Sequence, residues 1–436
     1  MPVPAALARA TFPAPVLDVL RTLAGAGHRS WLVGGAVRDL LLHRPRTATD
    51  FDVATPARPE EVTRLFRKVI PTGIEHGTVT VLARGELVEV TTFRGEGAYL
   101  DGRRPASVTF LQDLEADLAR RDFTMNALAF DPLGPEFRDP FGGRDDLRRR
   151  RVRAVGDPAA RFSEDGLRPM RAVRFVAQLG FELDPATRAA IPGALEVVRR
   201  VAAERITDEL SKLVVARHAP AALRLLHTTE LLGVVLPALA SLPERERVHA
   251  EAVAGEAPPE LAVRLAALLH PLGADGAGAA LAGLRLSRQV SDAATALVRF
   301  FPCLRAEGAG LPAPEPVALR RWLSRVEPQR VDTLLSLAAA EAHVTPPPSR
   351  VGAGAEVARL RKRVAAVLRE APPLSIRELA LDGREVAAAL GTAPGPRVGE
   401  ALRHLLDRVL QDPRENEPER LRAALRDWAA QQARSI

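Results

Sequence analysis

The spacing of apolar residues changes near Val155, and this change constrains the fold more than any other feature of the 436-residue chain. Between Trp31 and about Phe141, short β-like runs such as WLV, VTVL and LVEVTTF alternate with helical stretches such as PEEVTRLFRKV. Beyond Val155, apolar residues recur at helical spacing, as in LRPMRAVRFVAQLGF and GEALRHLLDRVL. The pattern predicts an α+β N-terminal domain, with a small mixed β-sheet and helices, followed by an all-α remainder.

The length of the chain and its Gly- and Pro-rich segments indicate several packed parts. A chain of 436 residues exceeds what one hydrophobic core usually fills. Gly and Pro cluster at four places, which we interpret as candidate joints or loops: 273–283, 308–316, 345–354 and 391–399. We expect four parts along the chain, namely a head (1–154), a helical neck (155–220), a helical body (221–345) and a helical tail (346–436).

Charge and cysteine usage limit the class of protein. The formal net charge is +7, and Arg supplies almost all of the positive charge, which fits a polyanionic partner. Cys303 is the only cysteine, which excludes an intramolecular disulfide and a zinc site made of cysteines. The sequence has no basic, apolar leader and no run of about 18 apolar residues. We therefore expect a cytoplasmic protein without a membrane segment.

The motif LVGGAVRD at 32–39 predicts a strand that turns into a helix. Gly34 and Gly35 form the turn, which would present backbone N–H groups to a phosphate, and Arg38 in the helix would add a positive charge. A double glycine alone more often marks an ordinary tight turn. The residues that follow decide between these two interpretations.

Two carboxylates follow in the segment TATDFDVAT. Asp50 and Asp52 are two residues apart in a predicted strand, so both point to the same face. A cation relieves the repulsion between them, and carboxylate oxygens suit Mg²⁺. Glu89, in the strand LVEVTTF, would complete a two-metal site. Such a pair is more often a solvated pair at a sheet edge, but the glycine turn just upstream favours Asp50 and Asp52 as metal ligands, with Glu89 as a third catalytic residue.

These motifs resemble those of the nucleotidyltransferase superfamily, specifically the family of class II tRNA nucleotidyltransferases and bacterial poly(A) polymerases. Nine segments match in order: GGAVRD (34–39), DFD (50–52), PTGIEHGTVTV (71–81), VEVTTFR (88–94), DGRRP (101–105), RRDFTMNALAFD (120–131), DPFGG (139–143), EDGLRPMRAVRF (164–175) and ERITDEL (204–210). The match is dense over residues 31–210 and thin beyond them. The resemblance implies two-metal transfer of nucleotides to an RNA 3′ end, without a nucleic-acid template.

The resemblance also implies which side chains bind the nucleotide besides Gly35 and Arg38. Asp165 and Arg168 match the pair that imitates a Watson–Crick partner in this family, and their spacing predicts one helix face. A carboxylate accepts from the exocyclic amine of cytosine or adenine, and a guanidinium donates to the ring acceptor beside it. Arg121, Arg171 and Arg174 match arginines that contact the nucleotide. Taken alone, an acid and an arginine at this spacing more often form a surface ion pair.

Four neighbours of these residues are expected to have structural roles. We expect Asp122 and Asn126 to brace the site, and Glu164 to cap the N-terminus of a helix. Gly166 stands where the family usually has Pro, and we expect it to loosen the turn without removing a functional group.

Two segments separate the members of the family. The segment 95–110 holds Asp101, Arg103 and Arg104, a loop that the resemblance associates with switching from C to A addition. The segment 379–421 resembles the tRNA-gripping tail of CCA-adding enzymes. We expect CCA addition to the 3′ end of tRNA from CTP and ATP, with Mg²⁺ as cofactor and no protein partner implied. The alternatives are an enzyme that adds only A, a poly(A) polymerase, and a non-catalytic tRNA-binding protein.

One histidine lies in a segment where some relatives carry a His-Asp phosphohydrolase-like motif. In LAALLHPLG, however, Pro271 follows His270 and occupies the position of the Asp. A metal-dependent hydrolase also needs a carboxylate partner and further His ligands. We therefore interpret His270 as a packed residue at the end of a helix.

Overall fold

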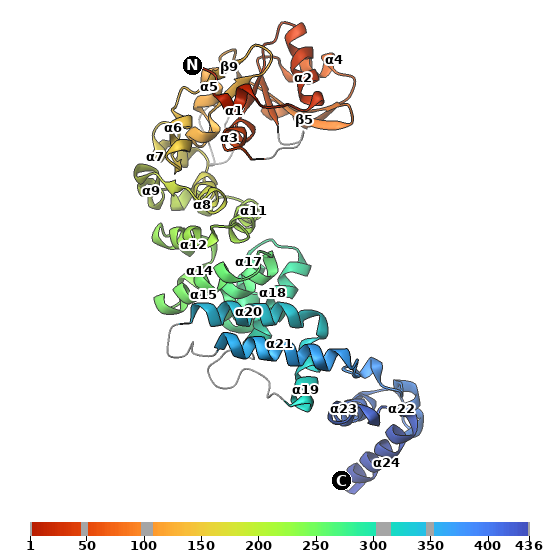
Figure 1. The fold of residues 1–436 in the computed structure, drawn as a ribbon. Coiled ribbons are helices and arrows are strands. Elements are labelled where there is room, and N and C mark those ends of the chain that lie inside the picture. Colours follow the sequence, from red (N-terminus) through yellow and green to blue (C-terminus); the bar gives the residue numbers. More distant parts are fainter. Residues whose placement is uncertain (1, 45–50, 97–107, 302–314, 346–352, 435–436) are drawn as a thin grey trace. The chain divides into compact units, whose positions relative to one another are not determined.

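The computed structural model describes residues 2–44, 51–96, 108–301, 315–345 and 353–434. A mixed sheet with helices comes first in the chain and helices follow it (Figure 1), which confirms the predicted fold class. The chain divides into two compact units, Met1–Leu242 with Ala280–Leu286, and Pro243–Ala279 with Ser287–Ile436. The finer division into head, neck, body and tail stays a prediction.

Seven strands of the first unit form one sheet in the order β3-β4-β5-β2-β1-β8-β9. These strands are β1 (Trp31–Val33), β2 (Asp52–Thr55), β3 (Val69–Gly73), β4 (Thr78–Ala83), β5 (Glu86–Thr92), β8 (Ala129–Asp131) and β9 (Glu136–Arg138). The middle strand, β2, runs antiparallel to β1 and parallel to β5. Because β2 is hydrogen-bonded on both sides, its first residue, Asp52, has a fixed place in the sheet.

Buried valines on the central strands form the core of the sheet. Val53, Val88 and Val90 are at most 1% exposed, as β-branched residues on a covered sheet face should be. Helix α2 (Ala14–Gly25) packs on β4 and β5. A second cluster, which includes Trp31 and Val33 of β1 and Leu118 of α5 (Leu114–Ala119), packs the end of β1 against that helix. The strand ends that carry the site are therefore held rigidly.

The helical part of the first unit is built around α8 (Arg168–Leu179), in which ten of twelve residues are buried. Helices α11 (Ala203–Val214) and α12 (Ala219–Thr228) pack on it. The remaining helices of this unit are α1 (Ala5–Ala8), α3 (Gly35–Leu41), α4 (Pro59–Leu65), α6 (Gly143–Arg148), α7 (Pro158–Glu164), α9 (Pro185–Ala190), α10 (Leu195–Arg199), α13 (Leu231–Val235) and α14 (Pro237–Ala240). Strand β11 (Glu182–Leu183), which pairs with β10 (Arg151–Val152), is an exception to the helical pattern predicted after Val155.

The described residues of the second unit are helical and contain no strand. The helices are α15 (Glu244–Glu256), α16 (Leu261–Leu269), α18 (Arg288–Phe300), α19 (Pro316–Val326), α20 (Val331–Val344), α21 (Ala353–Arg369), α22 (Gly383–Ala389), α23 (Pro396–Gln411) and α24 (Pro418–Arg434). Helix α16 packs against α15, α18 and α20. Helices α22, α23 and α24 share a separate core around Leu405, Leu421 and Trp428.

One segment predicted as a joint or loop forms a helix, although a boundary between the two units falls within it, at Ala279 and Ala280. Residues 273–283, GADGAGAALAG, form α17 (Gly273–Gly283). The prediction gave too much weight to glycine, because the alanines of this segment are the strongest helix formers. The glycines also allow close packing: an added Cβ on Gly278 would lie 3.8 Å from the Thr295 side chain of α18. Most of the segments 308–316 and 345–354 lies outside the described residues.

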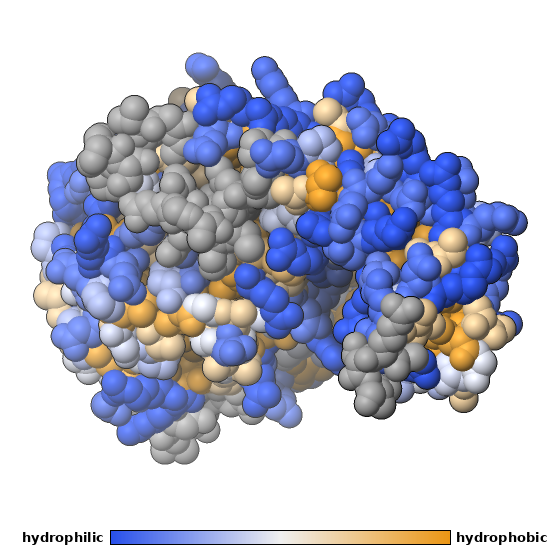
Figure 2. Space-filling model, turned by 90° about the horizontal axis from the view of Figure 1, so that it is seen from below, coloured by the Kyte–Doolittle hydropathy of each residue, from blue (hydrophilic) through white to orange (hydrophobic). Residues whose placement is uncertain are grey.

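The stretch Leu261–Gly283 is long and apolar enough to cross a membrane by length and composition, which the sequence analysis did not anticipate. Its first part, α16, is nevertheless a packed core helix of the second unit: seven of its nine residues are buried. Two polar residues of this stretch, Arg264 in α16 and His270 just after it, are also buried. Hydrophilic residues predominate on the described surface drawn in Figure 2, and apolar residues lie between them in small patches.

Candidate active site

A cavity of about 980 Å³ in the first unit brings the predicted site residues together. Nine of the ten line it: Gly35, Arg38, Asp52, Glu89, Arg121, Asp165, Arg168, Arg171 and Arg174. The tenth, Asp50, lies outside the described residues, as do Asp101, Arg103 and Arg104. The cavity lining contains eight arginines and four carboxylates. This excess of positive charge suits a polyphosphate ligand.

Asp52 and Glu89 are direct neighbours across the sheet. They occupy paired positions in the parallel strands β2 and β5. Glu89 is exposed on the cavity wall, but the protein around it removes part of its water and so raises its pKa, the nearby Asp52 raises it further, and Arg94 opposes both effects. The two carboxylates are thus held close enough to repel each other, in a place that a divalent cation would stabilise.

The glycine turn lies beside this carboxylate pair. Gly34 has φ +71° and ψ −132° and precedes the first residue of α3, a backbone conformation that side-chain-bearing residues rarely adopt. A Cβ at Gly34 would lie 2.8 Å from Nη1 of Arg121 and 3.9 Å from Oδ2 of Asp52. The turn therefore forms one wall of the site and must be glycine at this position.

Arg38 is held in a fixed orientation by two side chains. Its Nε and Nη2 donate to the carboxylate of Asp39 at 2.8 and 3.0 Å, and its Nη1 donates to Oδ1 of Asn126 at 2.6 Å. Burial lowers the pKa of Arg38 to about 10, against the opposing charge of Asp122. Arg38 therefore remains positively charged at neutral pH.

Asp122 links the 3₁₀ turn Thr124–Asn126 to helix α8. It accepts hydrogen bonds from Asn126 Nδ2 at 2.9 Å and from its neighbour's backbone N–H, and it pairs with Arg171 at 2.6 Å. Burial alone would raise its pKa, but the charge of Arg171 and these hydrogen bonds lower the pKa of Asp122 to about 2. The charge of Asp122 in turn raises the pKa of Arg171. Asp122 and Asn126 thus orient Arg171 and Arg38 toward the cavity, the bracing role expected of them.

Asp165 and Arg168 lie at a junction between two helices, and the prediction that they share one helix face was wrong. Helix α7 ends at Glu164, Asp165 is extended with φ −134° and ψ 110°, and α8 begins at Arg168. The side chain of Asp165 competes with helical hydrogen bonding, because its Oδ1 accepts from the backbone N–H of Leu167 at 3.0 Å. Both residues still reach the cavity.

The junction is tightly packed, and the expected effect of Gly166 is not what the structure shows. A Cβ at Gly166 would lie 2.5 Å from the carbonyl oxygen of Val197, in α10. Gly166 therefore allows a close approach of two backbone segments and does not loosen the turn.

The guanidinium of Arg168 is buried and fully oriented by acceptors around it. It donates to the backbone carbonyls of Arg161 and Arg120, each at 2.9 Å, and to Glu164 at 2.5 Å. Glu164 is the last residue of α7, so that the predicted N-cap role is wrong. It has a structural role nonetheless, since it pairs with Arg161 at 3.1 Å as well as with Arg168.

Two residues of ERITDEL contact the predicted site residues, and the sequence analysis assigned no role to either. Nη2 of Arg205 lies 3.3 Å from Oδ2 of Asp165. Glu209 pairs with Arg174 and lies 3.8 Å from Arg171. Both residues come from α11. The match of ERITDEL to the family could have indicated that these two residues have a role. Their partners, Arg174 and Asp165, lie about 35 and 40 residues earlier in the chain, so no local pattern connects them.

Arg121 pairs with a buried carboxylate, that of Asp117, which no sequence motif had indicated. Asp117 is 1% exposed and contacts Arg121 at 3.4 Å and Arg120 at 2.9 Å. Burial opposes ionisation, but the two arginines lower the pKa of Asp117. Asp117 lies in the last turn of α5 and Arg121 two residues after the end of that helix, so the chain that leaves the helix brings the two side chains together.

The residues present fit a divalent cation. Asp52 and Glu89 offer carboxylate oxygens on neighbouring strands, and hard oxygen ligands are those that such ions prefer. The raised pKa of Glu89 also fits a cation site, because part of the rise comes from repulsion by Asp52, which a bound cation would remove.

Comparison with known proteins covers nearly the whole chain. Residues 30–153 match the family described as "Poly A polymerase head domain", and residues 180–242 match "Probable RNA and SrmB- binding site of polymerase A". The chain is 40% identical over 412 residues to the CCA-adding enzyme of Geobacillus stearothermophilus, covering 94% of this chain and 95% of that one. It is also 40% identical over 423 residues to the CCA-adding enzyme of Geobacillus thermodenitrificans, covering 96% and 97%.

Solved structures show the same similarity. The crystal structure of the Bacillus stearothermophilus CCA-adding enzyme in complex with CTP aligns with a TM-score of 0.76 and 35% identity, over 97% of this chain and 98% of that one. The Thermotoga maritima CCA-adding enzyme complexed with tRNA_CCA aligns with a TM-score of 0.66 over 98% of both chains. At 17% identity the latter similarity concerns the fold alone.

Proposed function

Since this chain belongs to the family of CCA-adding enzymes, we propose that it adds C, C and A to the 3′ end of tRNA from CTP and ATP, releasing pyrophosphate. The observation that carries this proposal is the Asp52 and Glu89 pair beside a cavity lined by eight arginines. Phosphoryl transfer needs both features, namely oxygen ligands for a cation and positive charge for a triphosphate.

The divalent cation in this proposal is Mg²⁺, with Asp50 and Asp52 as its ligands and Glu89 as the third carboxylate. When bound, the metal lowers the pKa of the RNA 3′-hydroxyl and neutralises charge on the leaving pyrophosphate. Mg²⁺ completes its coordination shell with substrate phosphates and water, so that few protein ligands suffice.

The protein residues position the nucleotide. The turn at Gly34 and Gly35 forms one wall of the cavity in which the triphosphate binds, and Arg38 supplies a charge that persists at neutral pH, since its pKa is about 10. Arg121, Arg171 and Arg174 bind the triphosphate and sugar from the other walls of the cavity.

Asp165 and Arg168 choose the base in this proposal. The Asp165 carboxylate accepts from N4 of cytosine or N6 of adenine, whereas uracil and guanine place a carbonyl there. Arg205 holds Asp165 at 3.3 Å, and Glu164 holds Arg168 at 2.5 Å. The pair is therefore preoriented, which base discrimination without a template requires.

Purified protein with tRNA transcripts that end before C74, after C74 and after C75 tests the function. Each transcript is incubated with Mg²⁺ and with CTP, ATP or both. We expect two additions from CTP on the shortest transcript and three when both nucleotides are present. Because every tRNA is a substrate, binding should depend on phosphates, and the affinity should fall steeply between about 50 and 200 mM salt.

The other outcomes of this assay identify the alternatives. Addition of A alone to the transcript that ends after C75 indicates an A-adding enzyme, and repeated addition of A to any RNA indicates a poly(A) polymerase. Binding of tRNA without any addition indicates a non-catalytic tRNA-binding protein. For localisation we propose the cytoplasm, where tRNA and both nucleotides are available.

A further inference from the structure

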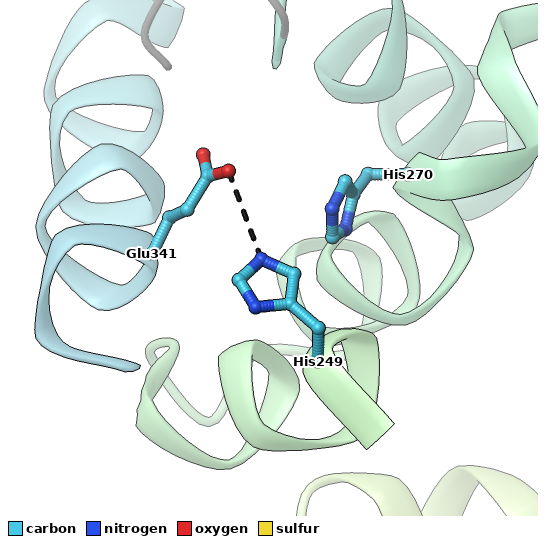
Figure 3. A group of neighbouring side chains, drawn as sticks. All are labelled: His249, His270 and Glu341. Atoms are coloured by element: carbon cyan, nitrogen blue, oxygen red, sulfur yellow. Dashed lines mark ion pairs between the residues drawn. The ribbon is translucent and has the colours of Figure 1, made fainter. Parts of the chain in front are cut away.

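Three helical segments of the second unit bring His249, His270 and Glu341 together (Figure 3). His249 belongs to α15, His270 to the 3₁₀ turn that follows α16, and Glu341 to α20. A ligand atom of each side chain lies within 4.8 Å of those of the other two. Among the residues that the structure describes, this is the one group of metal-ligating side chains with such spacing.

Two contacts, with Ala267 and Phe301, set the orientation of the His270 ring. Its Nδ1 lies 2.7 Å from the carbonyl oxygen of Ala267, and its ring stacks on that of Phe301 with centroids 4.3 Å apart. A carbonyl only accepts hydrogen bonds, so Nδ1 carries the proton and Nε2 carries the lone pair of the neutral ring. A backbone carbonyl on one ring nitrogen is the usual arrangement of a histidine that ligates a metal through the other.

His249 and Glu341 complete the group from two other helices. Nε2 of His249 lies 3.8 Å from Oε1 of Glu341, which is longer than a hydrogen bond. Two ligands of one tetrahedral ion, each about 2.0–2.2 Å from it, lie about 3.3 Å apart. Small side-chain rotations would therefore bring the three ligand atoms to the distances of a common ion.

Burial and access also suit a bound ion. Glu341 and His270 are 8% and 5% exposed, so that water stabilises the carboxylate poorly and a cation would stabilise it well. The side chain of His249 is 27% exposed. This histidine gives an ion an entry path from solvent.

We propose that His249, His270 and Glu341 form a binding site for a divalent transition-metal ion of the Zn²⁺ type. Two imidazoles and one carboxylate select Zn²⁺ and related ions over Mg²⁺, which prefers oxygen ligands alone. The ion ties together three segments that are far apart in sequence. His270 is a packed residue at the end of α16, as the sequence indicated, and the proposed ion gives it a further role that depends on partners from α15 and α20.

Full-length protein treated with a chelator and then titrated with Co²⁺ tests this site. Tetrahedral Co²⁺ with imidazole ligands absorbs visible light strongly, whereas Co²⁺ on carboxylates and water absorbs weakly, so the signal separates this site from that of Asp52. We expect one equivalent of strongly absorbing Co²⁺, displaced by Zn²⁺, and a higher Tm with Zn²⁺. His249→Ala and the nearly isosteric Glu341→Gln should each weaken binding on the order of a hundredfold or more.

His343→Ala is the matched control. His343 of α20 lies 3.9 Å from Glu256 of α15, so it forms a His–Glu pair between the same two helices, and no third ligand joins it among the described residues. This variant should bind Co²⁺ as the unmodified protein does. Absence of the absorption in the unmodified protein, or its persistence in both His249→Ala and Glu341→Gln, would overturn the proposal. The proposal would also fail if His249→Ala lowered the Tm by the same amount with and without Zn²⁺, because His249 and Glu341 would then form only an ion pair.

Discussion

Glu89 is a residue whose charge the surrounding protein disfavours. Loss of water and the neighbouring Asp52 raise the pKa of Glu89 above 4.5. A raised folded-state pKa means that the folded protein binds this proton more tightly than the unfolded chain does. Ionised Glu89 therefore destabilises the metal-free fold at pH values above the raised pKa, and this cost disappears below the unfolded value of 4.5. The cation proposed for this site would remove that cost by neutralising the charge that Glu89 and Asp52 share.

Glu89→Gln should stabilise the metal-free protein and strongly reduce its activity. With a chelator present, its Tm at pH 7 should exceed that of the unmodified protein, and the difference should vanish near pH 4. With Mg²⁺, nucleotide addition should fall by about a hundredfold or more, since a metal site contributes several kcal/mol to the transition state. Glu86→Gln, at the start of the same strand and outside the cavity lining, is the control. A lower Tm for Glu89→Gln at pH 7 would contradict the electrostatic explanation.

Asp165→Ala should relax nucleotide choice more than it weakens tRNA binding. Loss of one base-reading contact costs about 1–3 kcal/mol of discrimination, so the preference for CTP and ATP over UTP and GTP should fall about 10- to 100-fold. The ratios of kcat/KM for the four nucleotides, with the KM for tRNA, measure both effects. Asp157→Ala is the control, because Asp157 caps the other end of α7 through the backbone of Ala159 and Ala160. Unchanged selectivity in Asp165→Ala would refute its base-reading role.

At the scale of elements, the junction between α7 and α8 places the side chains of Asp165 and Arg168, for which we propose base selection. Asp165 ends one helix, Arg168 begins the next, and Gly166 between them contacts the backbone of Val197. The motif EDGLR correctly predicted that Asp165 and Arg168 lie together at the cavity, but it wrongly predicted one continuous helix. The break is not visible in the apolar pattern because it arises from a side-chain hydrogen bond and from a close approach by α10.

Gly166→Ala should therefore lower both stability and nucleotide selectivity. Its Cβ would lie 2.5 Å from a backbone oxygen, and the resulting backbone shift should cost about 1–3 kcal/mol. Gly193→Ala is the matched control, since a Cβ there meets nothing within 4 Å. Thermal unfolding and the CTP to UTP ratio of kcat/KM measure the two effects. Equal behaviour of the two variants would show that the junction tolerates the displacement.

At the scale of the whole molecule, each unit has its own core, and the described site residues belong to the first unit alone. Within the second unit, Arg320 of α19 ties the end of α23 in place. Its Nε and Nη2 donate to the carbonyl oxygens of Leu410 and Gln411 at 2.7 and 2.6 Å. These carbonyls belong to the last turn of α23, where a cation also complements the helix dipole.

Arg320→Ala should destabilise the second unit and raise the KM for tRNA, while the KM values for CTP and ATP stay unchanged. The expected loss is about 1–3 kcal/mol, because two carbonyls, one of them in the buried residue Leu410, lose a charged donor. Arg321→Ala is the control: its pair with Asp407 is exposed on both sides, and such pairs contribute about 0–1 kcal/mol. Steady-state kinetics with tRNA and with each nucleotide give the comparison. A changed KM for nucleotides in Arg320→Ala would show that the units are not independent in this respect.

The sequence by itself determined what depends on neighbouring residues in the chain. The period of the apolar pattern predicted the sheet followed by helices, and the order of the motifs predicted the family and the residues of the cavity. Short motifs suffice here because a strand, a glycine turn and a paired carboxylate are each set within a few residues. The structure leaves Asp50 outside its described residues, so its role rests on the motif.

Only the tertiary structure decided how distant segments meet. Asp122 pairs with Arg171, 49 residues away, and Arg205 supports Asp165, 40 residues away. His249, His270 and Glu341 converge from three helices. No local pattern encodes these contacts, because they depend on how whole helices pack. A charged side chain needs a specific partner only once this packing has removed that side chain from water.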